Sequence, residues 1–338
     1  MGEVHTLFSL LIGLILLVLA KISNLISKAG TEKVEALGIE YYPPQDANFL
    51  DMIYAYSRVG CNSSALLIYL AHKGYIKISE TNESKTSSFT IEKIKEYDGT
   101  DELEKYYLNQ LFNCGKSSNT VNESDLKEVF YKTINKIGIN VKQRNRNIWH
   151  KSPKASYLII QYIIIGVSIL LTLLGFIIGS FSFFDSLGIV MVFCGFITVS
   201  LETIFSKSMV LYTDEGRNLV TKIEGFKEFL TYAEKDRIEM LVHENPQYFY
   251  DILPYTYALD ITNVWVEKFD TMCTEPPEWY SSDKPYSSKN FNRFLNNGMK
   301  KLDNSMTSSP SSSRSHGGRS TGGGRSGRGS GGGGGSSW

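Results

Sequence analysis

The amino-acid sequence predicts a mainly α-helical membrane protein. Three transmembrane helices are expected, together with a winged-helix-like α+β domain and a second, small helical segment. The prediction rests on a pair of long apolar runs in mid-chain, a third apolar run near the N-terminus, and Lys and Arg residues that flank all three runs on one side. The chain has 338 residues and a formal net charge of zero. This allows two or three domains and does not favour nucleic acid as a partner.

The central apolar pair, residues 157–205, predicts a transmembrane helical hairpin. Tyr157–Ile178 has no charged residue, and at ~1.5 Å per residue it would extend roughly 33 Å, enough for a hydrocarbon core of about 30 Å. Leu187–Phe205 carries a single charge, Glu202, and the connection 179–186 is short and aromatic. The alternative is a buried helix pair in a soluble core, where two adjacent runs of this length are rare.

The first apolar run, residues 6–26, has two interpretations. As a signal peptide it would use Leu7–Ala20 as its apolar region, but Glu3 and His5 precede it where basic residues are typical. As a membrane span it has a workable length, and Lys21 can reach the headgroups from near its end. We favour a transmembrane helix in residues 1–27 with a short outer N-terminus, followed by a linker over 28–40.

The basic residues set the expected orientation. Residues 28–156 and 206–338 carry all the basic flanks and are placed in the cytoplasm, whereas the loop 179–186 has none. The prediction is a multi-pass protein of the cell membrane, in contact with the lipid bilayer and with the bulk of its chain cytoplasmic. The flanking residues are Lys28, Lys33, Lys142, Arg144, Arg146, Lys151, Lys154, Lys207 and Arg217.

Residues 41–150 have the outline of a winged-helix domain, which we expect to fold alone. Two helices are followed by two alternating strands with a polar connection, and then by two more helices. The expected elements are a helix from Asp46 to about Arg58 ended by Gly60, a helix capped by Asn62 or Ser63 and stopped by Gly74, strands over 75–79 and 88–91 joined by 80–87, and helices around 101–113 and 124–137.

The charge pattern of this domain argues against DNA binding. The helix that would read DNA, Ser63–His72, contains neither Lys nor Arg, and the lysines of the wing are matched by glutamates. Phosphate contacts normally supply most of the affinity for DNA. A protein-contact or structural role is therefore favoured, and DNA binding is the alternative.

Residues 206–300 predict an aromatic-rich helical cytoplasmic segment. Thr213 is expected to cap one helix, and Asn245-Pro246 to start another. The aromatic residues are expected to form a small core; the alternative is a surface packed on the membrane or on a partner. Residues 301–338 are rich in Gly, Ser and Arg, and we expect them to form a disordered tail that folding does not need.

The sequence offers no catalytic, cofactor-binding or metal-binding residues. Phosphate-loop, dinucleotide, zinc-helix and nucleophile-elbow motifs are absent, and the histidines are dispersed. Glu202 is the one carboxylate inside an apolar run; we interpret it as an interfacial anchor, with a role in an ion path as the alternative. The cysteines, Cys61, Cys114, Cys194 and Cys273, form no CxxC pair.

Three sequence blocks around the central hairpin carry a family resemblance. In their order, the chain resembles the predicted membrane proteins of the domain of unknown function 2207 over about residues 40–270. The resemblance implies architecture and location but no activity. Members usually carry a β-rich outer domain before the first span; this chain lacks it, which implies a fragment or a short member. The blocks are Ala65–Ile78, Leu211–Arg217 leading to Gly225-Phe226, and Asn245–Tyr255 with Trp265 and Phe269.

The function expected from the sequence is that of a non-enzymatic, membrane-anchored interaction or scaffold protein with two cytoplasmic modules. Its partners would be the lipid bilayer and another protein, with no small-molecule substrate evident. The alternative is a membrane-bound regulator whose winged-helix domain binds DNA. An electrophoretic shift assay on residues 41–150 would separate the two.

Overall fold

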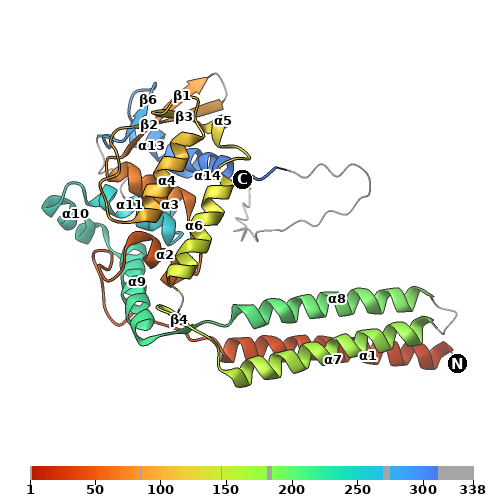
Figure 1. The fold of residues 1–338 in the computed structure, drawn as a ribbon. Coiled ribbons are helices and arrows are strands. Elements are labelled where there is room, and N and C mark those ends of the chain that lie inside the picture. Colours follow the sequence, from red (N-terminus) through yellow and green to blue (C-terminus); the bar gives the residue numbers. More distant parts are fainter. Residues whose placement is uncertain (1, 84–85, 146, 181–184, 269–274, 311–338) are drawn as a thin grey trace, which may run out of the picture.

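The chain forms two parts, a rod of three long helices and a body of shorter helices and strands (Figure 1). This is seen in a computed structural model, which describes residues 2–83, 86–145, 147–180, 185–268 and 275–310. The expected outer loop 179–186, Cys273 and most of the expected tail lie wholly or partly outside these residues. The body comprises residues 31–152 and 209–310.

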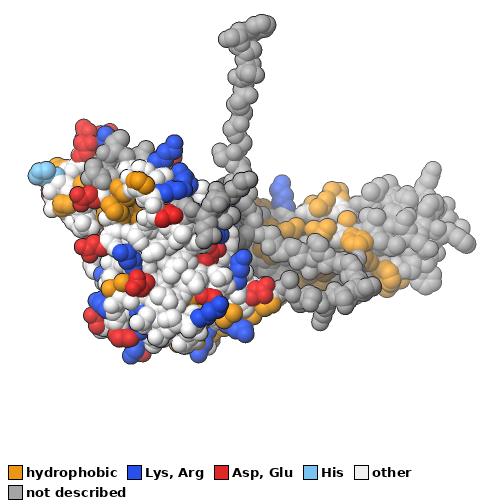
Figure 2. All heavy atoms as spheres, turned by 90° about the horizontal axis from the view of Figure 1, so that it is seen from above, with side chains coloured by type: hydrophobic (Ala, Val, Ile, Leu, Met, Phe, Trp, Pro, Cys, Tyr) orange, Lys and Arg blue, Asp and Glu red, His pale blue; other side chains and the backbone are white. Residues whose placement is uncertain are grey.

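The rod contains α1 (Gly2–Ala29), α7 (Ala155–Ser180) and α8 (Asp185–Ser208), which lie side by side (Figure 1). Leu11–Ala29 and Ala155–Leu174 are long and apolar enough to cross a membrane, and α8 contains a shorter apolar stretch, Val192–Ser206. Large apolar side chains face outward on the described part of the rod, whereas charged side chains are scattered over the body (Figure 2). Such an outer surface suits hydrocarbon better than water.

The body is built from segments on both sides of the central helical pair. The segment before the pair contains α2 (Phe49–Ser57), α3 (Ser63–His72), β1 (Ile76–Glu83), β2 (Thr86–Lys93), α4 (Glu102–Asn113), β3 (Thr120–Asn122), α5 (Glu123–Leu126), α6 (Tyr131–Arg144) and β4 (His150–Lys151). The segment after it contains β5 (Leu211–Tyr212), α9 (Asp214–Tyr232), α10 (Lys235–Glu244), α11 (Tyr248–Ala258), α12 (Thr262–Lys268), β6 (Tyr280–Ser282), α13 (Ser288–Arg293), the π-helical turn η1 (Phe294–Gly298) and α14 (Met299–Thr307).

Several helix starts follow the predicted capping chemistry. The side chain of Asn62 accepts a hydrogen bond from the backbone N–H of Ala65 at 3.0 Å, and Thr213 caps α9 in the same way. The prediction that Asp46 caps α2 is wrong, because Asn48 immediately precedes the helix and accepts from the Asp51 N–H at 2.8 Å. The predicted end of this helix at about Arg58 agrees with the structure, where α2 ends at Ser57 and Arg58 follows with φ of 58°, two residues before Gly60.

Three other boundaries differ from the prediction. The single helix expected over 124–137 is divided into α5 and α6 by a connection in which Glu128 has φ of 60°. The polar stretch 80–87 is not a loop, since β1 and β2 stay paired out to Glu83 and Thr86. Asn245 ends α10, and α11 begins three residues later, at Tyr248.

The sheet joins the two segments of the body. Its strand order is β3-β2-β1-β6, with β6 parallel to β1 and Ile78 opposite Tyr280. A second pairing, between β4 and β5, forms the short antiparallel ribbon between the body and the rod. We call β4 and β5 the ribbon.

One hydrophobic core runs through the whole body. Leu66 and Ile78 before the central helical pair and Trp265 and Phe294 after it are fully buried members of the same cluster. α3 packs against both α11 and α14. The two segments predicted as separate modules are therefore packed as one unit in the structure.

The predicted tail begins too early. α14 covers Met299–Thr307, and Met299, Leu302 and Met306 are fully buried. Their spacing of three and four residues places them on one helix face, which offsets the entropy of ordering this segment. The Gly- and Ser-rich composition begins only at about residue 308, after this helix. The expected disorder of residues 311–338 concerns residues outside the described ranges.

A close backbone approach between Gly60 and α6 gives an asymmetric prediction. A Cβ atom on Gly60 would lie 2.2 Å from the carbonyl oxygen of Gly138, whereas a Cβ on Gly138 would meet Gly60 only at 3.8 Å. We expect Gly60→Ala to lower the free energy of unfolding by about 1–2 kcal/mol through overpacking. Gly138→Ala should leave it unchanged or raise it by up to about 1 kcal/mol, because alanine favours helix. Chemical denaturation measures both, and equal losses would contradict the geometry.

Candidate functional site

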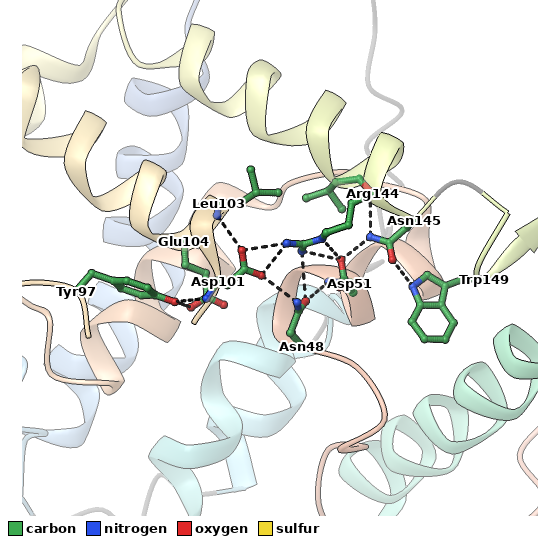
Figure 3. Close-up of polar contacts among 10 residues, drawn as sticks. Asn48, Asp51, Tyr97, Asp101, Leu103, Glu104, Arg144, Asn145 and Trp149 are labelled. Atoms are coloured by element: carbon green, nitrogen blue, oxygen red, sulfur yellow. Dashed lines mark hydrogen bonds and ion pairs between the residues drawn. The ribbon is translucent and has the colours of Figure 1, made fainter. Parts of the chain in front are cut away.

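A polar cluster lies where α2, α4 and α6 meet, centred on Arg144 at the end of α6 (Figure 3). The guanidinium donates to both carboxylate oxygens of Asp101 at 3.0 Å and to Asp51 at 2.7 Å. The side chains of Asp101 and Asp51 are only 6% and 14% exposed, so one cation neutralises two largely buried carboxylates. We call Asn48, Asp51, Asp101, Arg144 and Asn145 the Arg144 hub.

Each partner in the hub also completes a helix end. Asp101 caps α4 by accepting from the Leu103 N–H at 2.8 Å, and Asn48 caps α2 while its amide donates to Asp101 at 2.9 Å. The acidic groups therefore lie at helix N-termini, and Arg144 lies at a C-terminus, where the helix dipole favours each charge. The hub fixes the three helix ends relative to one another.

The hub continues toward the rod through Asn145 and Trp149. The Asn145 amide donates to Asp51, and its oxygen accepts from the indole N–H of Trp149 at 2.6 Å. The carbonyl of Trp149 accepts from the backbone N–H of Thr213 at 3.2 Å, which carries the contact to the start of α9. A chain of hydrogen bonds thus connects the body to the ribbon, on both sides of the central helical pair.

His150 lies in the ribbon, between the rings of Tyr54 and Tyr212 at centroid distances of 5.3 and 5.2 Å. Burial, reinforced by the positive charge of Arg58, lowers the pKa of His150 to about 4. The imidazole is therefore neutral at pH 7 and serves as an aromatic spacer in the ribbon.

Glu104 lies beside the hub and carries the ionisable group with the clearest pH response. The carboxylate is buried and accepts from the Tyr97 hydroxyl at 2.8 Å. Desolvation by burial raises the pKa of Glu104 from 4.5 to about 7. The protonated form is thus favoured by folding, and the position titrates near neutrality.

We expect Glu104 to make stability decline with pH. The stabilisation that the raised pKa of Glu104 contributes to folding is complete below about pH 4.5. Above that pH it falls, because the unfolded chain loses the proton before the folded protein does, and it is lost above about pH 7. In Glu104→Gln the amide oxygen can still accept from Tyr97, and this part of the decline should disappear. The melting temperatures of the wild type and of Glu104→Gln are compared between about pH 5 and about pH 8, the approximate limits of the titration. Parallel profiles would show that Glu104 is already ionised in the folded protein.

One hollow in the body, which we call the groove, has a volume of about 940 Å³. His72 at its margin contacts Asp251 at 2.9 Å, and Ile94 is 55% exposed at its edge. Trp279 lines it, and the Trp279 indole N–H has no hydrogen-bond partner among the residues that the structure describes. The lining includes Ile76, Lys77, Phe249, Tyr250, Glu275 and Pro277.

A second polar cluster lies inside the rod. Gln161 of α7 donates to Ser23 of α1 and to the backbone oxygen of Glu202 on α8, the latter at 3.3 Å. Ser168 of α7 donates to the Glu202 carboxylate at 2.8 Å. All four residues are fully buried. We call Ser23, Gln161, Ser168 and Glu202 the bundle cluster.

The interpretation of Glu202 as an interfacial anchor is wrong. Side chains on a helix tilt toward its N-terminus, and α8 runs toward the body, so the Glu202 carboxylate is directed away from the body and into the rod. Sequence reasoning missed Gln161 and Ser168, although their spacing of seven residues places both on one helix face. Ser23 and Ser27 likewise share the inner face of α1.

Within the described ranges, no group of three or more His, Cys, Asp and Glu side chains could hold a metal ion. Cys61 and Cys114 are half-buried, and burial raises the pKa of both thiols, to about 12 for Cys61. Neither is an activated nucleophile at neutral pH. The expected lack of catalytic and cofactor residues stays a prediction.

A rod of long apolar helices, joined by a ribbon and a hydrogen-bonded hub to a polar folded body, is the architecture of a helical membrane protein. Residues 39–269 match the family described as predicted membrane protein (DUF2207) C-terminal domain, and the chain belongs to this family. The match confirms the resemblance carried by the three sequence blocks. Neither the curated proteins nor the solved structures contain a match to the chain.

Proposed function

We propose that the protein is a three-span membrane protein that holds one cytoplasmic body at the membrane surface as a non-enzymatic interaction platform. The observation that carries the proposal is the continuous hydrogen-bonded path from the Arg144 hub through Trp149 to the ribbon. This path ties the end of α6 to the ribbon and to the start of α9, next to the points where the chain enters α7 and leaves α8. A body held in this way presents its surfaces in a fixed orientation to partners in or near the membrane.

The packing of the rod supports three spans. Ile12 and Leu16 of α1 are buried, with Leu171 of α7 packed against them, and Ser23 of α1 joins the bundle cluster. A cleaved signal peptide would leave these partners uncovered. Lys28, Lys151 and Lys154 lie at the body end of the rod, which supports a cytoplasmic body with the N-terminus outside.

The proposed winged-helix-like arrangement favours protein contact over DNA. α2, α3 and the β1–β2 hairpin follow one another in the expected order. Within α3, however, every residue except Tyr69 and His72 is buried, against elements that include α11 and α14. A helix covered in this way is not available to enter a DNA groove.

The groove is the surface we propose for a protein partner. Its occupant would be an extended segment of that partner. Apolar side chains would cover the aromatic and proline lining. Lys77 and Glu275 line the groove as well and provide charges of both signs.

A matched pair of substitutions tests the groove. Ile94→Glu alters the edge of the groove, and Ile139→Glu makes the same change on α6, where the side chain is 56% exposed compared with 55% for Ile94. Proteins cross-linked to the full chain in native membranes should include a species lost with Ile94→Glu and retained with Ile139→Glu. Identical cross-linking patterns for the two variants would remove the groove from the proposal.

Cysteine accessibility tests the orientation. In a chain without native cysteines, a cysteine at Ser118, which is exposed on the body, should label only after the membrane is permeabilised. A cysteine at Ser182, in the sequence-predicted outer loop, should label from outside. Native Cys61 is a poor reporter because its half-buried thiol has a raised pKa. Labelling of the Ser118 position in intact cells would overturn the orientation.

A further inference from the structure

The bundle cluster contains two buried oxygens without partners. The Oε2 atom of Glu202 and the Oε1 atom of Gln161 make no hydrogen bond within the described residues. Both residues are fully buried inside the rod. Two acceptor oxygens cannot satisfy each other, and an unpaired polar group in apolar surroundings is costly.

A proton on Glu202 would remove this conflict. A protonated carboxyl group has an O–H donor, and the amide oxygen of Gln161 is an acceptor in the same cluster. The other carboxyl oxygen already accepts from Ser168 at 2.8 Å. The acid form needs only that one donor and provides a donor of its own, whereas in the ionised form a single hydroxyl would be the side-chain donor to a buried charge.

The surroundings of Glu202 provide no opposite charge among the described side chains. α7 has no charged residue between Ala155 and Ser180, and the Lys21 side chain of α1 is exposed on the outside of the rod. The charged residues of α8 besides Glu202 are Asp185 and Lys207, near its ends. No ion pair to Glu202 is formed in the described structure.

Three members of the cluster, one in each helix, lie at one level of the rod, and Ser168 lies further inward. Ser23, Gln161 and Glu202 are each six residues from the body end of their helix, at Ala29, Ala155 and Ser208. At ~1.5 Å per residue this is about 9 Å inside the rod. The Glu202 side chain is directed further inward, to Ser168, so it does not reach back to the aqueous end.

We propose that the bundle cluster is a proton-binding site in which Glu202 is held as a neutral carboxylic acid at neutral pH. The proton sits on Oε2, Ser168 binds the other carboxyl oxygen, and Gln161 binds the backbone oxygen of the same residue. The inference rests on the proposed membrane insertion of the rod. It adds a bound ligand, the proton, to a region that the interaction role does not use.

Infrared spectroscopy of the full chain in phosphatidylcholine vesicles tests the protonation state. The difference spectrum between the wild type and Glu202→Gln should contain the carbonyl band of a protonated acid, both in mildly acidic and in mildly alkaline buffer. Replacement of that band by carboxylate bands in alkaline buffer would overturn the proposal. Glu202→Gln is chosen because its amide retains a donor and an acceptor of similar size.

Labelling of the wild type gives a measurement that needs no variant. Dicyclohexylcarbodiimide reacts with protonated carboxyl groups in apolar surroundings, and peptide mass spectrometry should find the adduct on Glu202. Absence of this adduct would overturn the proposed proton site. Suppression of the adduct by added sodium would also overturn it and would indicate a cation site instead. Resistance to alkaline extraction reports membrane insertion separately, so a chain that stays inserted with an ionised Glu202 contradicts this inference alone.

Discussion

Residues 41–150 expressed alone are expected to lack a cooperative melt, because about half of the core comes from the segment that follows the central helical pair. α3 contributes Leu66 and Leu70 to that core, and its covering helices include α11 and α14. At about 2 kcal/mol for each large apolar side chain, losing ten partners removes more than the whole stability of a typical domain, about 5–15 kcal/mol. The partners lost include Tyr248, Phe249, Ile252, Leu253, Trp265, Phe291, Phe294, Leu295, Leu302 and Met306.

The ribbon offers a matched positive control for this experiment. Lys151 is paired with Leu211, so Ser152 and Val210 follow as neighbours and can be joined by a two-residue turn. A chain of residues 31–310 with 153–209 replaced by Asn-Gly keeps both halves of the core, and Asn-Gly favours the hairpin turn. We expect this chain to be soluble and to unfold in one transition by circular dichroism. A cooperative melt for residues 41–150 alone would restore the sequence-based expectation of an autonomous domain.

The sequence predicts those features of this fold that depend on neighbouring residues. Asn62 and Thr213 are recognisable as caps because the bonds they make span three residues. The pairing of β1 with β6 joins residues about 200 positions apart, as in the contact between Glu80 and Tyr280 at 2.7 Å, and neither strand encodes its partner in a local pattern. Local caps therefore locate the helices without showing that the two segments share a core.

In the candidate sites, too, local sequence patterns identify the helices but not the contacts between distant residues. In the sequence, Arg144 belongs to the basic flank that sets orientation, and Asp101 is a helix cap; the structure gives both a further role in one hub. In the rod, the apolar pattern identifies the helices, but the direction of α8 and its packing decide where Glu202 points. The sequence shows Gln161 and Ser168 at helical spacing on α7, but only the structure shows that both contact Glu202.

Arg144→Met is expected to lower the free energy of unfolding by about 3 kcal/mol, the lower end of the range for breaking a buried ion pair, because the guanidinium remains 33% exposed. The substitution leaves the buried carboxylates of Asp51 and Asp101 without their cation. Lys142→Met, two residues earlier on the exposed face of α6, is the matched control and should change stability by less than about 0.5 kcal/mol. Chemical denaturation of the joined soluble chain measures both.

The geometry of the hub predicts how the free energy of unfolding lost in Arg144→Met depends on the individual contacts of Arg144. Arg144→Lys should recover part of it, since a single ammonium group supplies charge but cannot reproduce the planar set of bonds to two carboxylates. Asp101→Asn should weaken the hub, and adding Arg144→Met to it should cost less than Arg144→Met does in the wild type, because one unpaired carboxylate is already gone. Strict additivity of the two substitutions would mean that Arg144 stabilises α6 without coupling it to α4. Equal effects of Arg144→Met and Lys142→Met would remove the hub as the connection between the helix ends and the ribbon.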